Sequence, residues 1–372
     1  MALRARDDRE SGGFIYHSVV VRLAKIVRGV TGFEDVASAL EDASFAIFPL
    51  SSTDGGPAWD QYVERELEDT LTGNCLDVGW FFLENYMYRL VLGRVGYFTP
   101  GSSGYLLDPW RKSKEEALLS ALADFNQLCL EHPTPTFREA VLCSLWGNRN
   151  DLSLSAGVVE GNHSAGQLLV DDVAAVAGVV KNKKNRLDQQ RVAIVLDNCG
   201  AELLADLRLA SQLLDSDVAE VVLHCKAHPV FVSDALESDV HWHIAALKDT
   251  AMGLTLAQHV ANKRLLVVSH EFYCSPVEYS RAPAQVKSWY EEASLVIVKG
   301  DANYRRLFGD RPLPCDFPFV QVARRITSTP LLAIRTCKSP VIVGITQRQF
   351  LEETNRDKDW RNNGTVGIIQ FA

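Results

Sequence analysis

Polar residues that could bind a metal ion follow two apolar runs in the second half of the sequence. Asp197, Asn198 and Glu202 come after the run VAIVL, and Asp234 comes after FVS. Carboxylate and amide oxygens are the ligands that hard divalent cations prefer. Because a single Asp at a strand end usually caps a helix or a turn, the prediction of a metal site depends on the combination of these residues.

A third acidic strand end and basic residues that could bind an anionic group follow two later apolar runs. After LVIVKG and after LLAI the sequence continues with Asp301, Asn303, Tyr304 and Arg305, and with Arg335, Thr336 and Lys338. In open α/β sheets, ligands bind at the carboxyl ends of the strands. The sequence therefore predicts one rim of a sheet that holds an oxygen-ligated cation beside an anionic group.

The elements that must position these residues are short runs rich in β-branched residues, which begin at about residue 190. They are RVAIVLD, AEVVLHC, KRLLVVS, ASLVIVKGD, PLLAIRT and PVIVGI, with helical patterns such as AELLADLRLASQLL between several of them. Buried apolar strands that alternate with helices indicate an α/β fold with a mostly parallel sheet and helices on both faces. The stretch DDVAAVAGVVK is compatible with either a helix or a buried strand.

The first third of the chain has a helical texture instead. Between about residues 14 and 135, apolar residues recur at three- and four-residue spacing, which is typical of amphipathic helices. The segment GWFFLENYMYRLVLGRV is apolar on most faces, so we expect it at the centre of this part. We therefore expect a helical N-terminal part over residues 1–135 and an α/β/α domain over residues 136–372.

Composition argues against several classes of protein. Of the 372 residues, 47% are hydrophobic and 23% are charged, as in a soluble globular protein. The formal net charge of -9 argues against a nucleic-acid partner, and the longest apolar stretch, Val173 to Val180, is too short to cross a membrane. The N-terminus lacks the apolar core of a secretory signal. Because the eight cysteines include no CxxC pair, we expect reduced thiols and a cytoplasmic protein. Because no apolar stretch is long enough to cross a membrane, we expect no membrane partner.

Several polar side chains outside this set have a functional and a structural interpretation. His241 and His243 could share a metal if the chain were extended there, but hydrogen-bonded histidines are the more common case. Cys199 stands beside acidic positions and would be a poor thiolate nucleophile. Asp206 is expected to be structural, on a helix face.

The sequence leaves the roles of two further pairs of residues open. Glu84 and Arg89 lie in a mostly apolar helix, which favours a buried ion pair between them. Asn148 and Asp151, in GNRND, could either reach the site or cap a helix.

The quoted segments together resemble a known family. LDNCGAELLADL, FVSD, VKGDANYRRLFGD and IRTCK are similar to the damage-control phosphatases, formerly a domain of unknown function. The Arg-Thr-x-Lys element from Arg335 to Lys338 resembles the subfamily that is also called acidic residue methyltransferase. Upstream, ENYMYRL, LDPWRKSK and SLWGNRNDLSLS look like its helical portion and junction, so the resemblance covers nearly the whole chain.

The resemblance implies a fold, an activity and a cofactor. The fold would be a helical N-terminal part packed on a three-layer α/β/α domain. The activity would be hydrolysis of small phosphate esters, including sugar phosphates such as fructose 1-phosphate and fructose 6-phosphate, in metabolite damage control. The cofactor would be a divalent metal, namely manganese, nickel, cobalt or magnesium. The alternative function attributed to this subfamily is an S-adenosylmethionine-dependent protein-glutamate O-methyltransferase, which would need S-adenosylmethionine and a protein substrate.

The resemblance also assigns residues. It implies Asp197, Asn198 and Asp234 as metal ligands, and these three with Asp301 as catalytic residues. The residues expected to contact substrate are Glu202, Asp301, Ala302, Asn303, Tyr304, Arg305, Arg335 and Lys338. Asp301 could bind sugar hydroxyls or take a proton from water, and the sequence leaves both roles open.

Overall fold

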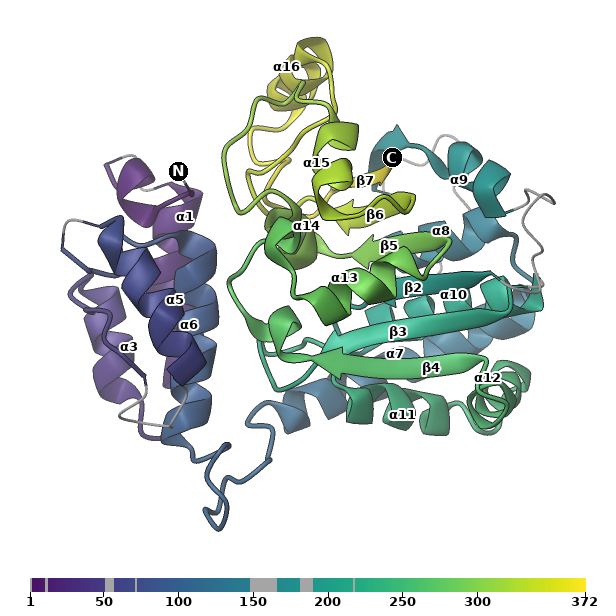
Figure 1. The fold of residues 1–372 in the computed structure, drawn as a ribbon, viewed down its shortest axis with the longest axis horizontal. Coiled ribbons are helices and arrows are strands. Elements are labelled where there is room, and N and C mark those ends of the chain that lie inside the picture. The colour runs from purple at the N-terminus through teal and green to yellow at the C-terminus, as the bar shows by residue number, and fades with distance from the viewer. Residues whose placement is uncertain are drawn as a thin grey trace.

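The computed structural model describes residues 2–10, 13–50, 57–70, 72–147, 166–180, 190–216 and 218–372 (Figure 1). Asn148 and Asp151, which the sequence left open as site or capping residues, lie outside this part of the chain. Two bodies are visible in Figure 1, a group of helices built from the first hundred residues and a larger body built around a sheet.

The sheet confirms the predicted α/β class with a mostly parallel arrangement. Its strands lie in the order β1-β7-β6-β5-β2-β3-β4, and every neighbouring pair is parallel except β6 and β7. The strands are β1 Gln167–Asp171, β2 Arg191–Val195, β3 Glu220–Lys226, β4 Leu265–His270, β5 Leu295–Lys299, β6 Leu331–Thr336 and β7 Val366–Phe371.

Helices cover both faces of this sheet, so the predicted three layers are present. The helices that follow residue 110 are α7 Arg111–Glu131, α8 Phe137–Trp146, α9 Val173–Val180, α10 Ala201–Asp215, α11 Glu237–Ala246, α12 Ala251–Ala261, α13 Ala284–Glu291, α14 Asp301–Leu307, α15 Phe319–Ile326 and α16 Gln347–Arg356. Short 3₁₀ turns η5 and η6 span Glu271–Cys274 and Tyr279–Arg281.

Alternate residues of the central strand face opposite layers, as a strand requires. In β2, Val192 and Ile194 belong to the core shared with α7, α8, α10, α11 and α12. Ala193 and Val195 belong to the core shared with α13, α14 and α15. Because both faces are buried, the strand reads as a continuous apolar run, which is why the sequence identified it.

The strand predictions were correct for β2 to β6 and wrong at two places, at FVS before Asp234 and at PVIVGI. Residues 340–345, PVIVGI, form no strand, although Val341 and Val343 are buried. Their carbonyls accept hydrogen bonds from the side chains of Arg335 and Gln370 rather than from a neighbouring strand, and Gly344 has a left-handed φ of 72°. The sequence analysis did not predict β1 and β7, and the ambiguous stretch at 173–180 is helix α9.

The N-terminal part is helical, as expected. It contains η1 Ala5–Asp8, α1 Phe14–His17, the π-helical segment η2 Ser18–Leu23, α2 Ala24–Arg28, α3 Glu34–Glu41, α5 Pro57–Glu68 and α6 Trp80–Arg94. Every residue of α6 from Trp80 to Gly93 is buried, which confirms that the densely apolar segment lies at the centre of this part. No helix in the described part of the chain is long and apolar enough to span a membrane.

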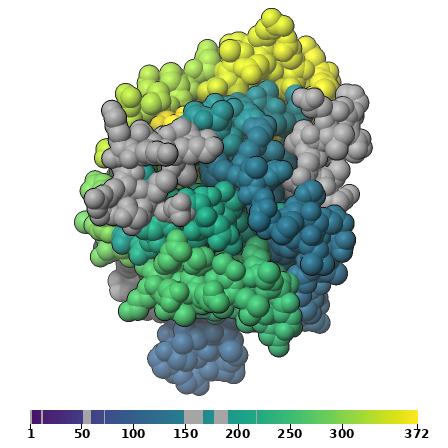
Figure 2. Space-filling model, turned by 90° about the vertical axis from the view of Figure 1, so that its right-hand side faces the viewer, coloured from purple at the N-terminus to yellow at the C-terminus, as the bar shows by residue number. Residues whose placement is uncertain are grey.

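The packing of α7 bears on where the two parts divide. Leu118, Phe125 and Leu128 of α7 belong to the core of the sheet and its helices, whereas Trp110 belongs to the core of the N-terminal helices. We therefore propose a division near residue 110 rather than at the expected residue 135. Seen from the end remote from the N-terminal helices, the connection between α6 and α7 projects at the bottom of the molecule (Figure 2).

Candidate active site

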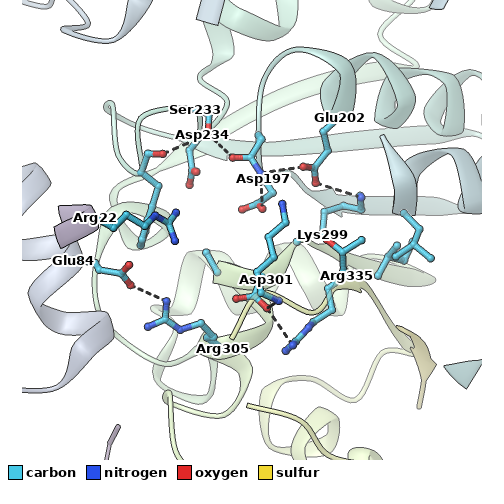
Figure 3. Close-up of a pocket in the computed structure, with 18 of the residues that line it drawn as sticks. Arg22, Glu84, Asp197, Glu202, Ser233, Asp234, Lys299, Asp301, Arg305 and Arg335 are labelled. Carbon is cyan, nitrogen blue, oxygen red and sulfur yellow. Dashed lines mark hydrogen bonds and ion pairs between the residues drawn. The ribbon is translucent and has the colours of Figure 1, made fainter. Parts of the chain in front are cut away.

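The predicted polar strand ends meet at the carboxyl edge of the sheet, between the two parts (Figure 3). The strand order reverses between β5 and β2, because the chain builds β3 and β4 on one side of β2 and returns to place β5 on the other. Ligands of open α/β sheets bind at such a reversal. The cavity there has a volume of about 180 Å³, and its charged lining residues are Arg22, Glu84, Asp197, Glu202, Asp234, Lys299, Asp301, Arg305, Arg335 and Lys338.

Backbone pairing between two loops brings Asp197 and Asp234 together. The Cys199 N–H donates to the carbonyl of Ser233 at 2.7 Å, and the Ala235 N–H donates to the carbonyl of Asp197 at 2.8 Å. These bonds satisfy backbone groups that would otherwise be buried without partners. They also fix the relative position of the two carboxylates, although 37 residues separate them in the chain.

The segment before Asp234 is not the strand that the sequence predicted. Phe231 and Val232 have left-handed φ angles of 51° and 66°, which large side chains rarely adopt. The chain therefore makes a tight turn after β3 and comes back to the end of β2. Backbone strain of this kind persists where the surrounding structure enforces it, and it is frequent at functional sites.

The two carboxylates are almost fully buried, with Asp197 5% and Asp234 1% exposed. Burial raises the pKa of Asp197 well above its usual range, and the nearby carboxylates of Asp234 and Glu202 raise it further. Burial likewise raises the pKa of Asp234, although Lys226 lies 3.1 Å from its Oδ2 and opposes the shift. Oδ1 of Asp197 has no hydrogen-bond partner within the described residues, which is costly for a buried carboxylate.

This arrangement fits a divalent cation. A cation would compensate the repulsion between Asp197 and Asp234 and would bind the unpartnered Oδ1 of Asp197. Among the residues that the structure describes, no three side chains of His, Cys, Asp or Glu converge as metal ligands. A metal here would therefore depend on two carboxylates, the amide oxygen of Asn198, and oxygens of water or substrate.

Hydrogen bonds orient the Asn198 side chain. Its Nδ2 donates to Oδ2 of Asp197 and to Oε2 of Glu202, both at 3.0 Å, while Oδ1 accepts from the Ser233 hydroxyl at 2.6 Å. Glu202 and Ser233 thus hold opposite ends of the amide. Glu202 was expected to contact substrate; it lines the pocket, but its carboxylate is already bonded to Asn198 and close to Lys299.

Beneath the pocket lies a buried charge cluster around Lys299. Its Nζ donates to the carbonyl of Ser144 at 2.7 Å and lies 3.3 Å from Asp206 and 3.6 Å from Glu202. Glu202 and Asp206 stand four residues apart on α10, so they face the same way. Burial raises the pKa of Asp206 to about 7, although Lys299 opposes the shift. Asp206 is structural, as expected, because it bonds Ser144 and Lys299 and does not line the pocket.

Asp301 holds the Arg-Thr-x-Lys element in place. Its Oδ1 accepts hydrogen bonds from the Lys338 N–H at 3.0 Å and the Ser339 hydroxyl at 3.1 Å, and it lies 3.2 Å from Nη2 of Arg335. Arg335 is 1% exposed and also donates to the carbonyls of residues 339 and 341. The Lys338 side chain lines the pocket and makes no ion pair within the described part of the chain.

Helical geometry divides the expected substrate residues of α14 into two sets. Successive residues are rotated by about 100°, so Asp301, Ala302 and Arg305 share one side of the helix while Asn303 and Tyr304 point elsewhere. The first three line the pocket and the other two do not. Asn303 and Tyr304 are therefore buried beside the pocket and do not line it, and substrate contact by the whole segment stays a prediction.

Both excluded side chains are bonded inside the protein. The Asn303 Nδ2 donates to the carbonyls of Leu196 and Lys299 at 3.0 and 2.9 Å, which joins the ends of β2 and β5. The Tyr304 hydroxyl donates to Oε1 of Gln370 at 2.7 Å. These residues maintain the shape of the rim, and the sequence pattern alone could not separate that role from substrate contact.

Arg305 lines the pocket, but its charge is compensated by acidic residues. It lies 2.7 Å from both Glu84 and Asp310, and its guanidinium stacks 3.5 Å from the centroid of the Trp80 ring. The predicted pair of Glu84 with Arg89 is therefore wrong: Arg89 lies over a phenylalanine ring instead. Glu84 joins the N-terminal part to the α/β/α domain and lines the site, a role that sequence reasoning missed.

Arg22 is a second site residue that the sequence analysis missed. It belongs to the π-helical segment η2 and lines the pocket from the N-terminal side, beside Glu84 (Figure 3). No spacing signal identified it, because it is one of many charged residues on an amphipathic helix. A π-helical segment is frequent at functional sites, but the sequence does not reveal where one forms.

The remaining candidate residues are structural. His243 is buried: its Nε2 accepts from the Gly200 N–H at 2.9 Å and its Nδ1 lies 2.7 Å from the carbonyl of Asp239. His241 lies elsewhere on the same helix and is half exposed. Burial raises the pKa of the Cys199 thiol well above its usual range, which agrees with the expectation that it is no nucleophile.

Comparison with known proteins gives consistent results over most of the chain. The sequence model described as damage-control phosphatase ARMT1-like domain matches residues 18–351. Proteins named damage-control phosphatase ARMT1 from mouse and human are 31% and 30% identical to this chain, over 84% of its length and 79% of theirs. The zebrafish protein of the same name is 29% identical over 85% of this chain.

A solved structure agrees with the fold. The crystal structure of a DUF89 family protein from Pyrococcus horikoshii matches with a TM-score of 0.53 at 16% sequence identity. The match covers 95% of this chain and 96% of that one. Both parts therefore belong to the shared architecture.

Proposed function

This chain belongs to the ARMT1-like damage-control phosphatase family, and we propose that it is a divalent-metal-dependent phosphatase of small phosphate esters. The observation that carries this proposal is the buried Asp197 carboxylate with an unpartnered oxygen, beside Asp234 and within one pocket with Lys338. Lys226 is paired with Asp234, so a metal cation would compensate the charge of Asp197, and an ammonium group without an ion pair suits a phosphate oxygen.

We propose Asp197, Asn198 and Asp234 as the metal-binding residues. When bound there, a divalent cation supplies Lewis acidity that activates water and neutralises phosphate charge. The chain contributes the orientation of its ligands, because Glu202 and Ser233 hold the Asn198 amide and Lys226 holds Asp234. Manganese, nickel, cobalt and magnesium are all compatible with this oxygen-rich set.

We propose that the side chain of Lys338 binds the phosphate group that is transferred in the reaction. Its backbone N–H is fixed by Asp301, so the side chain starts from a defined position. Burial raises the pKa of Asp197 and the charge of Lys338 opposes that rise, so Lys338 acts on the proposed metal-binding side of the pocket. Arg335 and Arg305 would act by shaping the pocket, since both are buried and paired with carboxylates.

The role of Asp301 follows from its contacts. Its Oδ1 is bonded by Lys338, Ser339 and Arg335, so we propose that Asp301 mainly positions this segment.

Proposed substrates are sugar phosphates such as fructose 1-phosphate and fructose 6-phosphate, whose hydroxyls would face the polar lining. All eight cysteines are free, which supports the proposal of a cytoplasmic location.

The test is phosphate release by metal-free and reloaded protein. The purified chain is treated with chelator, its metal content is measured, and it is reloaded with Mn²⁺, Co²⁺, Ni²⁺ or Mg²⁺ before addition of fructose 1-phosphate or fructose 6-phosphate. We expect no turnover without metal and recovery with at least one ion. Full turnover by metal-free protein would contradict the proposal. Methyl transfer from labelled S-adenosylmethionine to a protein, without phosphate release, would favour the methyltransferase alternative.

A further inference from the structure

Most charges in the pocket are paired within the protein. Lys299 is compensated by Glu202 and Asp206, Arg305 by Glu84 and Asp310, and Arg335 by Asp301. Two lining cations make no ion pair within the part of the chain that the structure describes, and they are Arg22 and Lys338. An unpaired cation that lines a cavity is available to a ligand.

These two cations act on different sides of the cavity. Lys338 lines the cavity from the side of the α/β/α domain, where its backbone N–H donates to Asp301 at 3.0 Å. Arg22 projects from the N-terminal helices beside Glu84 (Figure 3), where its charge opposes the rise that burial gives the pKa of Glu84. A phosphate ester whose phosphorus is near Asp197 would therefore extend its leaving group toward Arg22.

The local structure aims Arg22 at the cavity. Val19 and Leu23 of the same π-helical segment are buried in the core of the N-terminal part. The backbone of Arg22 is thus anchored, while its side chain is exposed and lines the pocket. A guanidinium offers five donors in a planar fork, which suits hydroxyl, carboxylate and phosphate oxygens alike.

We propose that Arg22 is a substrate-binding residue that recognises oxygen atoms of the leaving group. This inference rests on the proposed phosphatase function and adds a basis for its specificity. The N-terminal helical part then selects phosphate esters with an oxygen-rich leaving group over those with an apolar one. Fructose 1-phosphate represents the first class and phenyl phosphate the second.

The experiment measures kcat and KM of metal-loaded protein with both esters. The variants are Arg22→Ala, Arg22→Lys and, as a matched control, Lys25→Ala, which removes an exposed cation three residues away and outside this pocket. Thermal unfolding of each variant checks the fold. A lost hydrogen bond to a charged donor predicts a fall of about 10–100-fold in kcat/KM for fructose 1-phosphate with Arg22→Ala.

Selectivity distinguishes the outcomes. We expect phenyl phosphate turnover to change by less than about twofold, Arg22→Lys to lie between the parent and Arg22→Ala, and Lys25→Ala to match the parent. An equal loss for both esters would overturn the inference, because Arg22 would then act on the phosphate or the fold. No loss for either ester would overturn it as well. A parent protein that hydrolyses neither ester would refute the proposed function itself, and the inference with it.

Discussion

Replacing Gly300 by alanine tests whether the close approach of β5 to Asp197 builds the site. Gly300 stands between β5 and α14 with a left-handed φ of 82°. A Cβ added there would lie 2.6 Å from Cβ of Asp197 and closer still to its carboxylate. The substituted chain would have to move Asp197, which is fixed by its backbone hydrogen bond to residue 235.

The expected cost has two parts. A non-glycine residue in the left-handed region costs roughly 1–2 kcal/mol, and overpacking at a buried contact costs about 1–3 kcal/mol. Gly300→Ala should therefore lower the free energy of unfolding by about 2–5 kcal/mol. A shift of about 1 Å at a reacting group costs on the order of a hundredfold in rate, so turnover should fall by at least that factor.

Gly32 and Gly101 provide matched controls. Their φ angles are 88° and 87°, but an added Cβ would meet no atom within 4 Å at either position. In Gly32→Ala and Gly101→Ala the free energy of unfolding should fall only by the cost of the left-handed backbone conformation, and Mn²⁺ binding and turnover should not change. Urea unfolding, calorimetric Mn²⁺ titration and phosphate release would be compared across the three variants. If Gly300→Ala resembled the controls in stability and activity, the proposed packing of Gly300 against Asp197 would be refuted.

Three other predictions follow from the site. Asp197→Asn should keep the fold but lower turnover by at least about a hundredfold, as measured by phosphate release at saturating Mn²⁺; normal turnover would refute its role as a ligand. Lys338→Ala should lower kcat/KM for phosphate esters by roughly 2–4 kcal/mol in transition-state stabilisation without weakening Mn²⁺ binding, and weaker metal binding with normal turnover would contradict the phosphate role. Burial lowers the pKa of His243 to about 4; since the unfolded chain takes up this proton near pH 6.5, stability should fall by about 3 kcal/mol as pH drops from 6.5 to 4. Urea unfolding of His243→Gln across this range should show a smaller pH dependence, and an unchanged dependence would exclude His243 as its source.

Strands β2 to β6 were predictable because each contains a run of apolar residues, whereas Gly367 and Gln370 interrupt the equally buried β7. The runs that became β2 to β6 needed no tertiary information, and the polar residues after β2 and β5 followed from them. PVIVGI is also apolar, but it contains Pro340 and Gly344. The side chains of Arg335 and Gln370 donate hydrogen bonds to its carbonyls. Nothing local to the run reveals those partners.

The candidate site was predictable where position along the chain determined it. Asp197 and Asp301 come at the ends of strands, and ligands of open α/β sheets bind at the carboxyl ends of strands, so the sequence located both residues. Asp234 also lines the pocket, but a strained turn presents it and not the strand that the sequence predicted. Asn303 and Tyr304 share a motif with Asp301, but the rotation of α14 turns them into the core.

The junction of the two parts explains why the sequence did not predict that Arg22 and Glu84 line the site. Arg305 is buried between Glu84 of α6 and Asp310, and it stacks on Trp80. Removing one partner of a buried ion pair typically costs about 3–5 kcal/mol, so this contact holds the helices firmly on the carboxyl edge of the sheet. The packing of the two parts against each other, and not any spacing in the sequence, places Arg22 and Glu84 at the pocket. The helical part therefore forms a wall of the candidate site and stabilises it, and the substrate selection that we propose for Arg22 depends on the same contact.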